Sequence, residues 1–288
     1  MLRGLGKGIQ LLPGSPATLF VPWDDGYYVI DPGSSESRTK DIASVGKIKG
    51  VLLTHFHSDH VLAAKGLTSE EGIYAPIIEA GGVESIGLRR AISFGGYAPE
   101  GLIYHVKAVS VKVDHVFRPP HKIGPLEAIP LPGHNYGQVG YLTEDGLLYA
   151  ADSLFGDKLL KSAGIPYYQN YREALETLRY LREHARDYRK IVPSHGPVVE
   201  GRRAEELLDF NIEVVEALPD KVMSTLISGG RTAEQITYKI LGEEGAKITP
   251  SSIILSSVTV RSVLAHLYEE GKVSVEADER GLVWKLNM

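Results

Sequence analysis

One short segment constrains this chain more than any other, because it concentrates ligand-type side chains directly after an apolar run. Residues 50–54 are mostly apolar, and a strand buried on both faces is predicted there. The loop that follows holds four potential metal ligands: His55, His57, Asp59 and His60. A strand end is a rigid mount, and the loop leaving it can aim alternate side chains into one pocket. Imidazole and carboxylate groups suit Zn²⁺, iron or Mn²⁺, so a metal site is predicted here.

Three more candidates follow predicted strand ends further along the chain. They are His134 after Leu131-Pro132-Gly133, Asp152 after residues 147–151, and His195 after Val192-Pro193-Ser194. The seven side chains suffice for two cations a few ångströms apart with one carboxylate between them. The chain has no cysteine, which excludes thiolate ligands, disulfides and a cysteine nucleophile.

Composition limits the class of protein to which this chain can belong. The 288 residues are 43% hydrophobic and 23% charged, which is typical of a globular protein with one large domain or one domain plus a smaller one. No apolar run is long enough for a membrane span and no secretory signal is found, so a cytoplasmic protein without a membrane partner is expected. Asparagine and glutamine are scarce, a weak indication of a thermophilic source. The net charge of −5 does not favour strong nucleic-acid binding.

The first two-thirds of the chain alternate strand-like and helix-like segments, which predicts sheets covered by helices. Strands are expected at residues 17–22, 27–31, 50–54, 139–142, 147–151 and 191–193, and helices at about 35–46 and 173–186. Residues 76–125 have weak periodicity and two glycine pairs. They are interpreted as a helical insertion that is either a lid or a surface excursion without a role.

The pattern changes after residue 201. Helices are expected at residues 204–218, 232–241 and 258–270, followed by a hairpin of residues 272–276 and 282–286. Helix, helix, helix, hairpin is the order of a winged-helix domain, so the predicted domains are 1–201 and 202–288. The third helix has Arg261 and His266 but also Glu269 and Glu270, so this domain is expected to cover the site or mediate a homodimer rather than bind DNA.

The order of these motifs resembles the metallo-β-lactamase superfamily. Asp31-Pro32-Gly33, the His-x-His-x-Asp-His loop, Pro132-Gly133-His134, a lone Asp and a late Gly-flanked His all occur in sequence, over about residues 18–197. The resemblance implies an α/β fold, a four-layer αβ/βα sandwich with the site at one edge, followed here by the small winged-helix-like domain.

The resemblance also implies a ligand set. His55, His57 and His134 would bind the first cation, Asp59, His60 and His195 the second, and Asp152 both, while Asp31 would support the ligands without binding. Two divalent ions, zinc first and iron, manganese or nickel as alternatives, would lower the pKa of a shared water so that hydroxide attacks the substrate. Asp59 would be catalytic, holding the proton and passing it to the leaving group.

The substrate is less constrained. A broad hydrolase of small ester-type substrates is predicted, acting on carboxylic esters, lactones, thioesters, phosphodiesters or phosphotriesters. The alternatives are an endoribonuclease of single-stranded RNA, since the C-terminal region resembles the tail of some lactamase-like endoribonucleases, and a non-catalytic metal-stabilised binding protein. Four aromatic residues are expected to contact substrate, with ordinary packing as the alternative: Tyr136, Phe155, Tyr167 and Tyr168.

Overall fold

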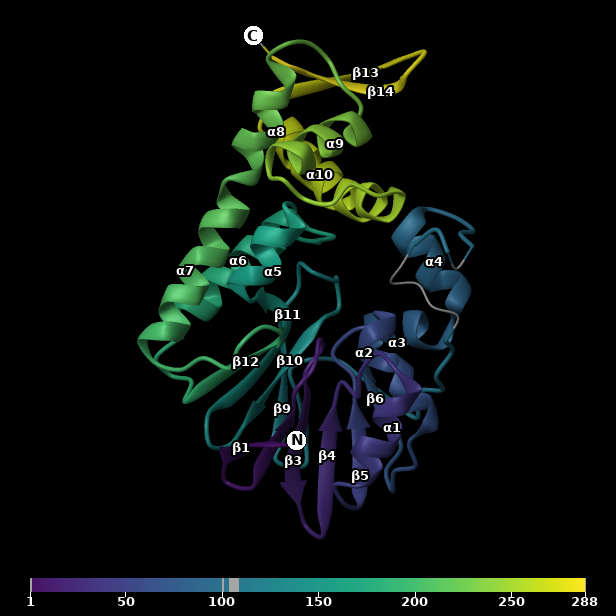
Figure 1. Ribbon diagram of the computed structural model, residues 1–288, viewed down its shortest axis with the longest axis vertical. Coiled ribbons are helices and arrows are strands. Elements are labelled where there is room, and N and C mark those ends of the chain that lie inside the picture. The colour runs from purple at the N-terminus through teal and green to yellow at the C-terminus, as the bar shows by residue number, and fades with distance from the viewer. Residues whose placement is uncertain (1, 100, 104–108, 288) are drawn as a thin grey trace.

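The computed structural model describes residues 2–99, 101–103 and 109–287, and it contains two large sheets that face each other with helices outside them (Figure 1). The first sheet has the order β1 (Arg3–Gly6), β2 (Ile9–Leu12), β3 (Thr18–Trp23), β4 (Gly26–Ile30), β5 (Ile48–Leu52), β6 (Ile73–Pro76) and β7 (His115–Phe117). The second has the order β12 (Lys190–His195), β11 (Leu147–Phe155), β10 (Val139–Thr143), β9 (Leu126–Pro130) and β8 (His121–Ile123).

Three apolar clusters define four layers. One fills the space between the sheets and includes Leu19, Leu52 and Tyr149. A second packs the outer face of the first sheet against α1 (Glu36–Ala43) and α3 (Ile77–Glu84). A third packs the second sheet against α5 (Asp157–Ala163), α6 (Tyr171–Glu183) and α7 (Arg202–Glu216). The predicted α/β class and αβ/βα sandwich are therefore confirmed.

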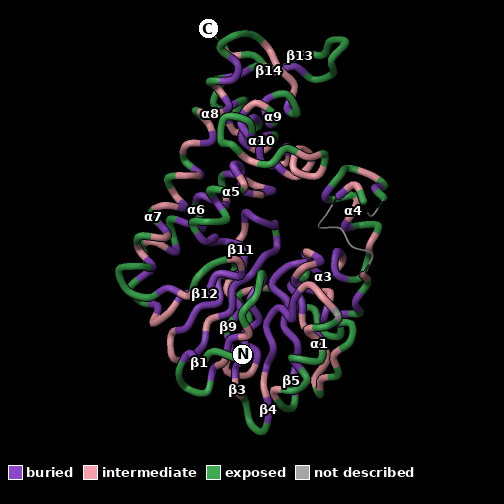
Figure 2. The backbone as a smooth tube through the Cα atoms, in the orientation of Figure 1, coloured by how far each residue is buried: buried purple, intermediate pink, exposed green. Residues whose placement is uncertain are grey.

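Strand direction explains where a site can form. The pairs β4–β5, β5–β6 and β11–β12 are parallel, so their carboxyl ends meet at one edge of the sandwich. All nine residues of β11 are buried because both faces of this strand are covered, and Figure 2 shows it purple. Buried tyrosines join the layers there, since Tyr141 donates to the carbonyl oxygen of Leu53 at 2.9 Å and Tyr149 to that of Ala17 at 2.8 Å.

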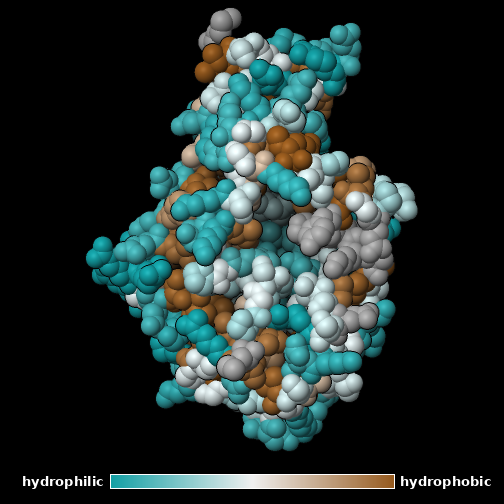
Figure 3. All heavy atoms as spheres, in the orientation of Figure 1, coloured by the Kyte–Doolittle hydropathy of each residue, from teal (hydrophilic) through white to brown (hydrophobic). Residues whose placement is uncertain are grey.

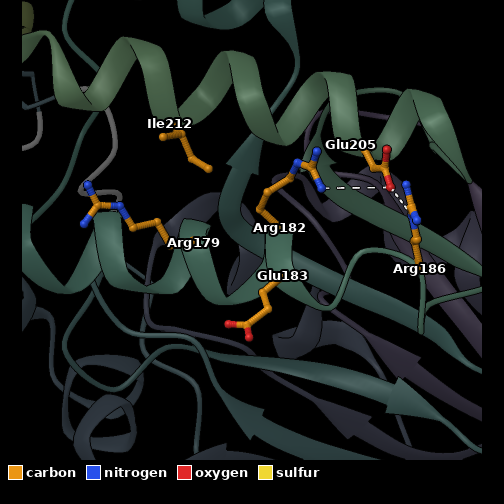
Figure 4. Close-up of a pocket in the computed structure, with 6 residues that line it drawn as sticks. All are labelled: Arg179, Arg182, Glu183, Arg186, Glu205 and Ile212. Carbon is orange, nitrogen blue, oxygen red and sulfur yellow. Dashed lines mark hydrogen bonds and ion pairs between the residues drawn. The ribbon is translucent and has the colours of Figure 1, made fainter.

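An arginine-rich pocket lies between α6 and α7, on the outside of the second sheet (Figure 4). Its three arginines are all paired with carboxylates: Arg179 with Glu216, Arg182 with Asp209, and Arg186 with Glu205, each at 2.6 Å. Each cation is already paired, so the ion pairs join the two helices and the described lining residues of the pocket include no free cation for an anionic ligand.

The stretch 76–125 contains more sheet than predicted. Its helical part is α3 and α4 (Ile86–Phe94), with Gly95 in a left-handed conformation ending α4. Further on, β7 pairs with β6 in the first sheet and β8 with β9 in the second. Residues 100 and 104–108 of this stretch lie outside the described residues.

The C-terminal region contains α8 (Leu218–Leu226), α9 (Ala233–Glu243), α10 (Pro250–Glu269) and the hairpin β13 (Val273–Asp278) and β14 (Gly281–Leu286). Helix α8 lies outside the predicted helices, because Pro219 directly follows the helix expected at residues 204–218. Proline is nevertheless tolerated in the first turn of a helix, and Pro219 lies there in α8. Helix α10 begins eight residues before the predicted start, with Thr249 and Ser252 forming a capping box. No helix in the described part of the chain is long and apolar enough to cross a membrane.

Candidate metal centre

The structure brings all seven predicted ligand-type side chains into one cluster. His55 and His57 follow β5, while Asp59 and His60 lie in the one-turn helix α2 (Ser58–Val61). The other three come from the second sheet or its loops: His134 between β9 and β10, Asp152 in β11 and His195 at the end of β12. Ala151, just before Asp152, has a positive φ of 50°, and the β11–β12 register shifts beside it, so the strand is locally bent at the carboxylate.

The cluster divides into two groups of donor atoms. In the first, His57 Nδ1 lies 3.0 Å from His55 Nε2 and 2.9 Å from His134 Nε2. In the second, Asp59 Oδ2 lies 3.4 Å from His195 Nε2 and 3.7 Å from His60 Nε2.

Asp152 lies between the two groups. Its Oδ2 is 3.3 Å from His134 Nε2 and 3.5 Å from His195 Nε2, and its Oδ1 is 3.4 Å from His60 Nε2. Each carboxylate oxygen therefore faces the second group, and Oδ2 also faces the first. A single carboxylate in this position can serve both groups at once.

Hydrogen bonds to the outer ring nitrogens orient three of the imidazoles. Thr54 donates its hydroxyl proton to Asp31 Oδ2 at 2.7 Å, so it can only accept from His55 Nδ1 at 2.9 Å. His60 Nδ1 donates to Asp31 Oδ2 at 2.7 Å, and His134 Nδ1 to the Tyr167 carbonyl oxygen at 2.9 Å. In each case Nε2 faces the cluster, the orientation found in metal-binding histidines.

Ring nitrogens and carboxylate oxygens that converge in this way need protons or a cation among them, because their lone pairs repel one another. His60 Nε2 and Asp152 Oδ1 are also buried atoms with no hydrogen-bond partner among the described residues. Such groups are costly to bury unpaired, and imidazole with carboxylate is a donor set for divalent transition metals. The residues present therefore fit a divalent metal.

The pKa shifts follow the same division. Burial lowers the pKa of His55 and His57 well below the usual value and that of His134 to about 4, so the first group is neutral at pH 7. Burial opposes protonation of His60 and His195 too, but the facing carboxylates outweigh it and raise the pKa of His195 to about 9. A cation binding to the second group would therefore have to displace protons.

Asp31 and Ser15 form hydrogen bonds to candidate metal ligands. Asp31 is fully buried, and its oxygens accept from Thr54 N at 2.9 Å, from the Thr54 hydroxyl and from His60 Nδ1. Its acceptor positions are thus used in joining β4, β5 and α2. Ser15, which the sequence did not single out, has its hydroxyl 2.6 Å from His195 Nδ1.

A second residue that the sequence did not single out is Glu79 on α3, which is 1% exposed. Its carboxylate accepts from Phe56 N at 3.0 Å in the first ligand loop, and from Asn135 Nδ2 at 2.9 Å and Gly137 N at 2.8 Å in the His134 loop. Burial raises the pKa of Glu79 to about 7, against these three donors, which lower it. Glu79 thus joins the two loops that carry the histidines of the first group. The sequence feature that could have identified it is a glutamate in an otherwise apolar helical stretch.

We expect Glu79→Ala to weaken metal binding by about 10–100-fold, the range for supporting residues around a metal. The substitution leaves buried N–H groups without an acceptor, which costs about 1–3 kcal/mol of stability for each group, and it removes the link between the two loops. Competition with a chelator measures the affinity. Glu84→Ala is the matched control, because Glu84 is exposed at the end of the same helix. Equal affinities in both variants would contradict the role of Glu79.

The C-terminal region reaches the cluster through α10. Thr259 Oγ1 accepts from Tyr168 N at 2.8 Å and donates to the Pro166 carbonyl oxygen at 2.9 Å. The segment it holds supports His134, since Tyr167 O accepts from the His134 ring and Gln169 N donates to the His134 carbonyl oxygen at 3.2 Å. One helix of this region is therefore linked to one of the first group's histidines.

We expect Thr259→Val to lower the free energy of unfolding by about 1–3 kcal/mol and to weaken metal binding, because it leaves the buried Tyr168 N–H unpaired. Thr237→Val is the control: Thr237 is equally buried, but its hydroxyl donates only to Ala233 within α9. Chemical denaturation and chelator competition measure the two effects. Loss of stability with unchanged metal affinity would show that α10 does not act on the site.

The four predicted substrate residues differ in exposure. Tyr136 is 55% exposed, and the half-buried Tyr167 has its ring centre 5.3 Å from those of His57 and His134. Phe155 and Tyr168 are buried, with ring centres 5.8 Å and 6.5 Å from that of His134. Tyr167 therefore lies against two histidines of the first group, Phe155 and Tyr168 are buried beside His134, and Tyr136 is exposed in the His134 loop.

Comparison with known proteins agrees with this geometry. A family model described as the metallo-beta-lactamase superfamily matches residues 13–195, more than half of the chain. The chain therefore belongs to the metallo-beta-lactamase superfamily.

Within that superfamily the curated relatives are distant. A hydroxyacylglutathione hydrolase of Shewanella denitrificans is 30% identical over 129 residues, 44% of this chain and 42% of the relative. One of Shewanella pealeana is 26% identical over 152 residues, 51% of this chain and 50% of the relative. The chain thus spans about half the length of the curated relatives it matches.

Solved structures share the whole fold. A metallo-beta-lactamase family protein of Thermus thermophilus has a TM-score of 0.72 at 17% identity, covering 99% of this chain and 100% of that one. A beta-lactamase domain protein of Burkholderia ambifaria has the same TM-score at 16% identity, covering 99% and 93%. The match includes the C-terminal region as well as the sandwich.

Proposed function

We propose that this chain is a dinuclear metal-dependent hydrolase of ester-type bonds. The observation that supports this most is the position of Asp152, whose Oδ2 faces histidines of both groups. His55, His57 and His134 would hold one cation, and Asp59, His60 and His195 the other. Zinc is the first expectation, because it is common in sites built from imidazole and carboxylate groups. Iron, manganese and nickel remain alternatives, because a nitrogen and oxygen donor set without sulfur accepts them as well.

When bound, two such cations supply a water nucleophile at neutral pH and stabilise negative charge on the attacked oxygen. The chain's own residues do the rest. Asp59, whose side chain is 23% exposed, would take a proton at its carboxylate and pass it to the leaving oxygen or sulfur. Burial raises the pKa of Tyr167 to about 12, so its hydroxyl stays protonated and can donate to a substrate oxygen.

The distant relatives support the ester class, since a hydroxyacylglutathione hydrolase acts on a thioester. Residues 202–288 would form a second, winged-helix-like unit that packs over the site. The contact between Thr259 and residues 166–168 supports that placement, but nothing in it favours binding of nucleic acid.

Elemental analysis of protein purified without chelator, combined with a substrate panel, tests the proposal. The panel contains p-nitrophenyl acetate, a γ-lactone, an acyl thioester and bis-p-nitrophenyl phosphate. We expect about two transition-metal ions per chain and turnover of at least one carboxylic ester or thioester. Full metal loading without turnover of any member would overturn the proposal and favour a non-catalytic binding protein.

A further inference from the structure

Exposed apolar side chains are concentrated next to the candidate metal centre. Of the eighteen large hydrophobic residues that are exposed among the described residues, six lie between positions 77 and 97. They are Ile77, Ile78, Leu88, Ile92, Phe94 and Tyr97, which we call the α3–α4 apolar face. Exposed apolar residues are normally scattered singly, and a concentration of them is typical of a binding surface.

This face continues to the loop of His134. A side-chain carbon added to Gly137 would lie 2.5 Å from Ile78 Cβ, so the backbone of that loop packs directly on the face. Tyr136, in the same loop, adds a seventh exposed apolar side chain. Ile78 of the face therefore packs against Gly137, which follows the candidate ligand His134 by three residues in the chain.

Two members of the face also line a cavity of about 740 Å³ that α10 borders. Ile92 and Phe94 line one side, and Val258 and Ala265 of α10 line the other. Gln169 lines it next to Tyr136, accepting from Tyr136 N at 3.3 Å and donating its backbone N–H to the His134 carbonyl oxygen. Figure 3 shows a hollow on this side of the molecule between the positions of α10 and α4, bordered in part by brown side chains.

The charged residues of the cavity do not favour an anion. Arg172 donates to Glu269 at 2.6 Å, and Arg261 pairs with Glu234 on α9. Glu173 and Glu176 add further negative charge at the same wall. Phosphate recognition needs unpaired arginine or lysine, and the described lining residues include none.

We propose that the α3–α4 apolar face and this cavity bind the uncharged, apolar acyl or aryl part of the substrate. This inference rests on the proposed ester hydrolysis and narrows it to hydrophobic esters, in preference to RNA or charged peptide thioesters. Removing a methylene group from water contributes about 0.8 kcal/mol, which is up to about fourfold in kcat/KM per methylene when the chain is bound in the transition state.

The test is a series of p-nitrophenyl esters from acetate to decanoate, assayed with the metal-loaded full chain. We expect kcat/KM to rise about two- to fourfold per methylene until the cavity is filled. The double variant Ile92→Ser/Phe94→Ser should reduce the ratio of octanoate to acetate by at least tenfold. Ile227→Ser is the control, because Ile227 is 77% exposed and lies outside this face, at the end of α8.

The outcomes separate this inference from the function on which it rests. Turnover that does not depend on chain length, or a preference for single-stranded RNA, would overturn the inference and leave hydrolysis standing. If no ester is hydrolysed, binding of the neutral fluorophore N-phenyl-1-naphthylamine still tests the cavity: the double variant should bind at least tenfold more weakly than Ile227→Ser. Light scattering adds a further check, because a double variant that only dissociates a dimer would show that a second copy covers the face.

Discussion

Replacing Asp152 with asparagine is expected to lower ester hydrolysis by at least roughly 10³-fold, because two adjacent cations contribute several kcal/mol of transition-state stabilisation. Asp152 Oδ2 lies 3.3–3.9 Å from the Nε2 atoms of His134, His195 and His55, so its charge is shared by both groups. Asparagine keeps the volume of the side chain but loses the negative charge that a second cation needs. Elemental analysis should show at least one metal ion fewer per chain.

The matched control is Asp157→Asn. Asp157 lies five residues further on, in the first turn of α5, where its exposed carboxylate is 3.8 Å from Lys161. The Asp157→Asn variant should keep the metal content and turnover of the unsubstituted protein, since exposed ion pairs contribute little to stability. If Asp152→Asn also kept both metal ions and full turnover, Asp152 would not be a shared ligand and the dinuclear proposal would fail.

Asp59→Asn has the second-largest expected effect, a loss of roughly 10²–10⁴-fold in kcat. The substitution leaves the first group unchanged and removes the carboxylate that faces His195 and His60 at 3.4 and 3.7 Å. It therefore removes both a ligand of the second group and the proposed proton carrier. KM should change much less than kcat, because the apolar contacts of the substrate are elsewhere.

Steady-state kinetics with parallel elemental analysis separates the two roles of Asp59. Loss of kcat with two metal ions retained would assign proton transfer to Asp59, and loss of kcat with one ion retained would assign ligation. Asp41→Asn, at an exposed position of α1, serves as the control. Unchanged turnover in Asp59→Asn would show that Asp59 is neither the proton carrier nor a ligand that hydrolysis needs.

The ligand loops could be predicted because their signal is local. His55, His57, Asp59 and His60 fall within six residues, directly after a strand whose apolar run is visible in the sequence. His134, Asp152 and His195 each lie at or near the end of a predicted strand. Carboxyl ends of parallel strands share an edge, so convergence of these residues needed only the alternation of strands and helices.

Residues that act across long separations could not be predicted in the same way. Glu79 contacts Phe56 and Gly137, which are 23 and 58 positions away, and Ser15 contacts His195 from 180 positions away. Neither has a local pattern that distinguishes it from an ordinary core glutamate or loop serine. Only the packing of α3 and of the N-terminal loop against the ligand loops identifies them.

The sequence by itself predicted sheets covered by helices and the seven candidate ligands, because strand periodicity and ligand-rich turns are short-range properties of the chain. The sandwich architecture was implied by the resemblance of its motifs to the superfamily. Tertiary structure decided which ring nitrogens face the cluster, that Asp152 lies between the two groups, and that α10, two residues of the α3–α4 apolar face and Tyr136 line one cavity. These features depend on side chains brought together from distant segments, and their positions are set by packing between layers rather than by any one segment's own preferences.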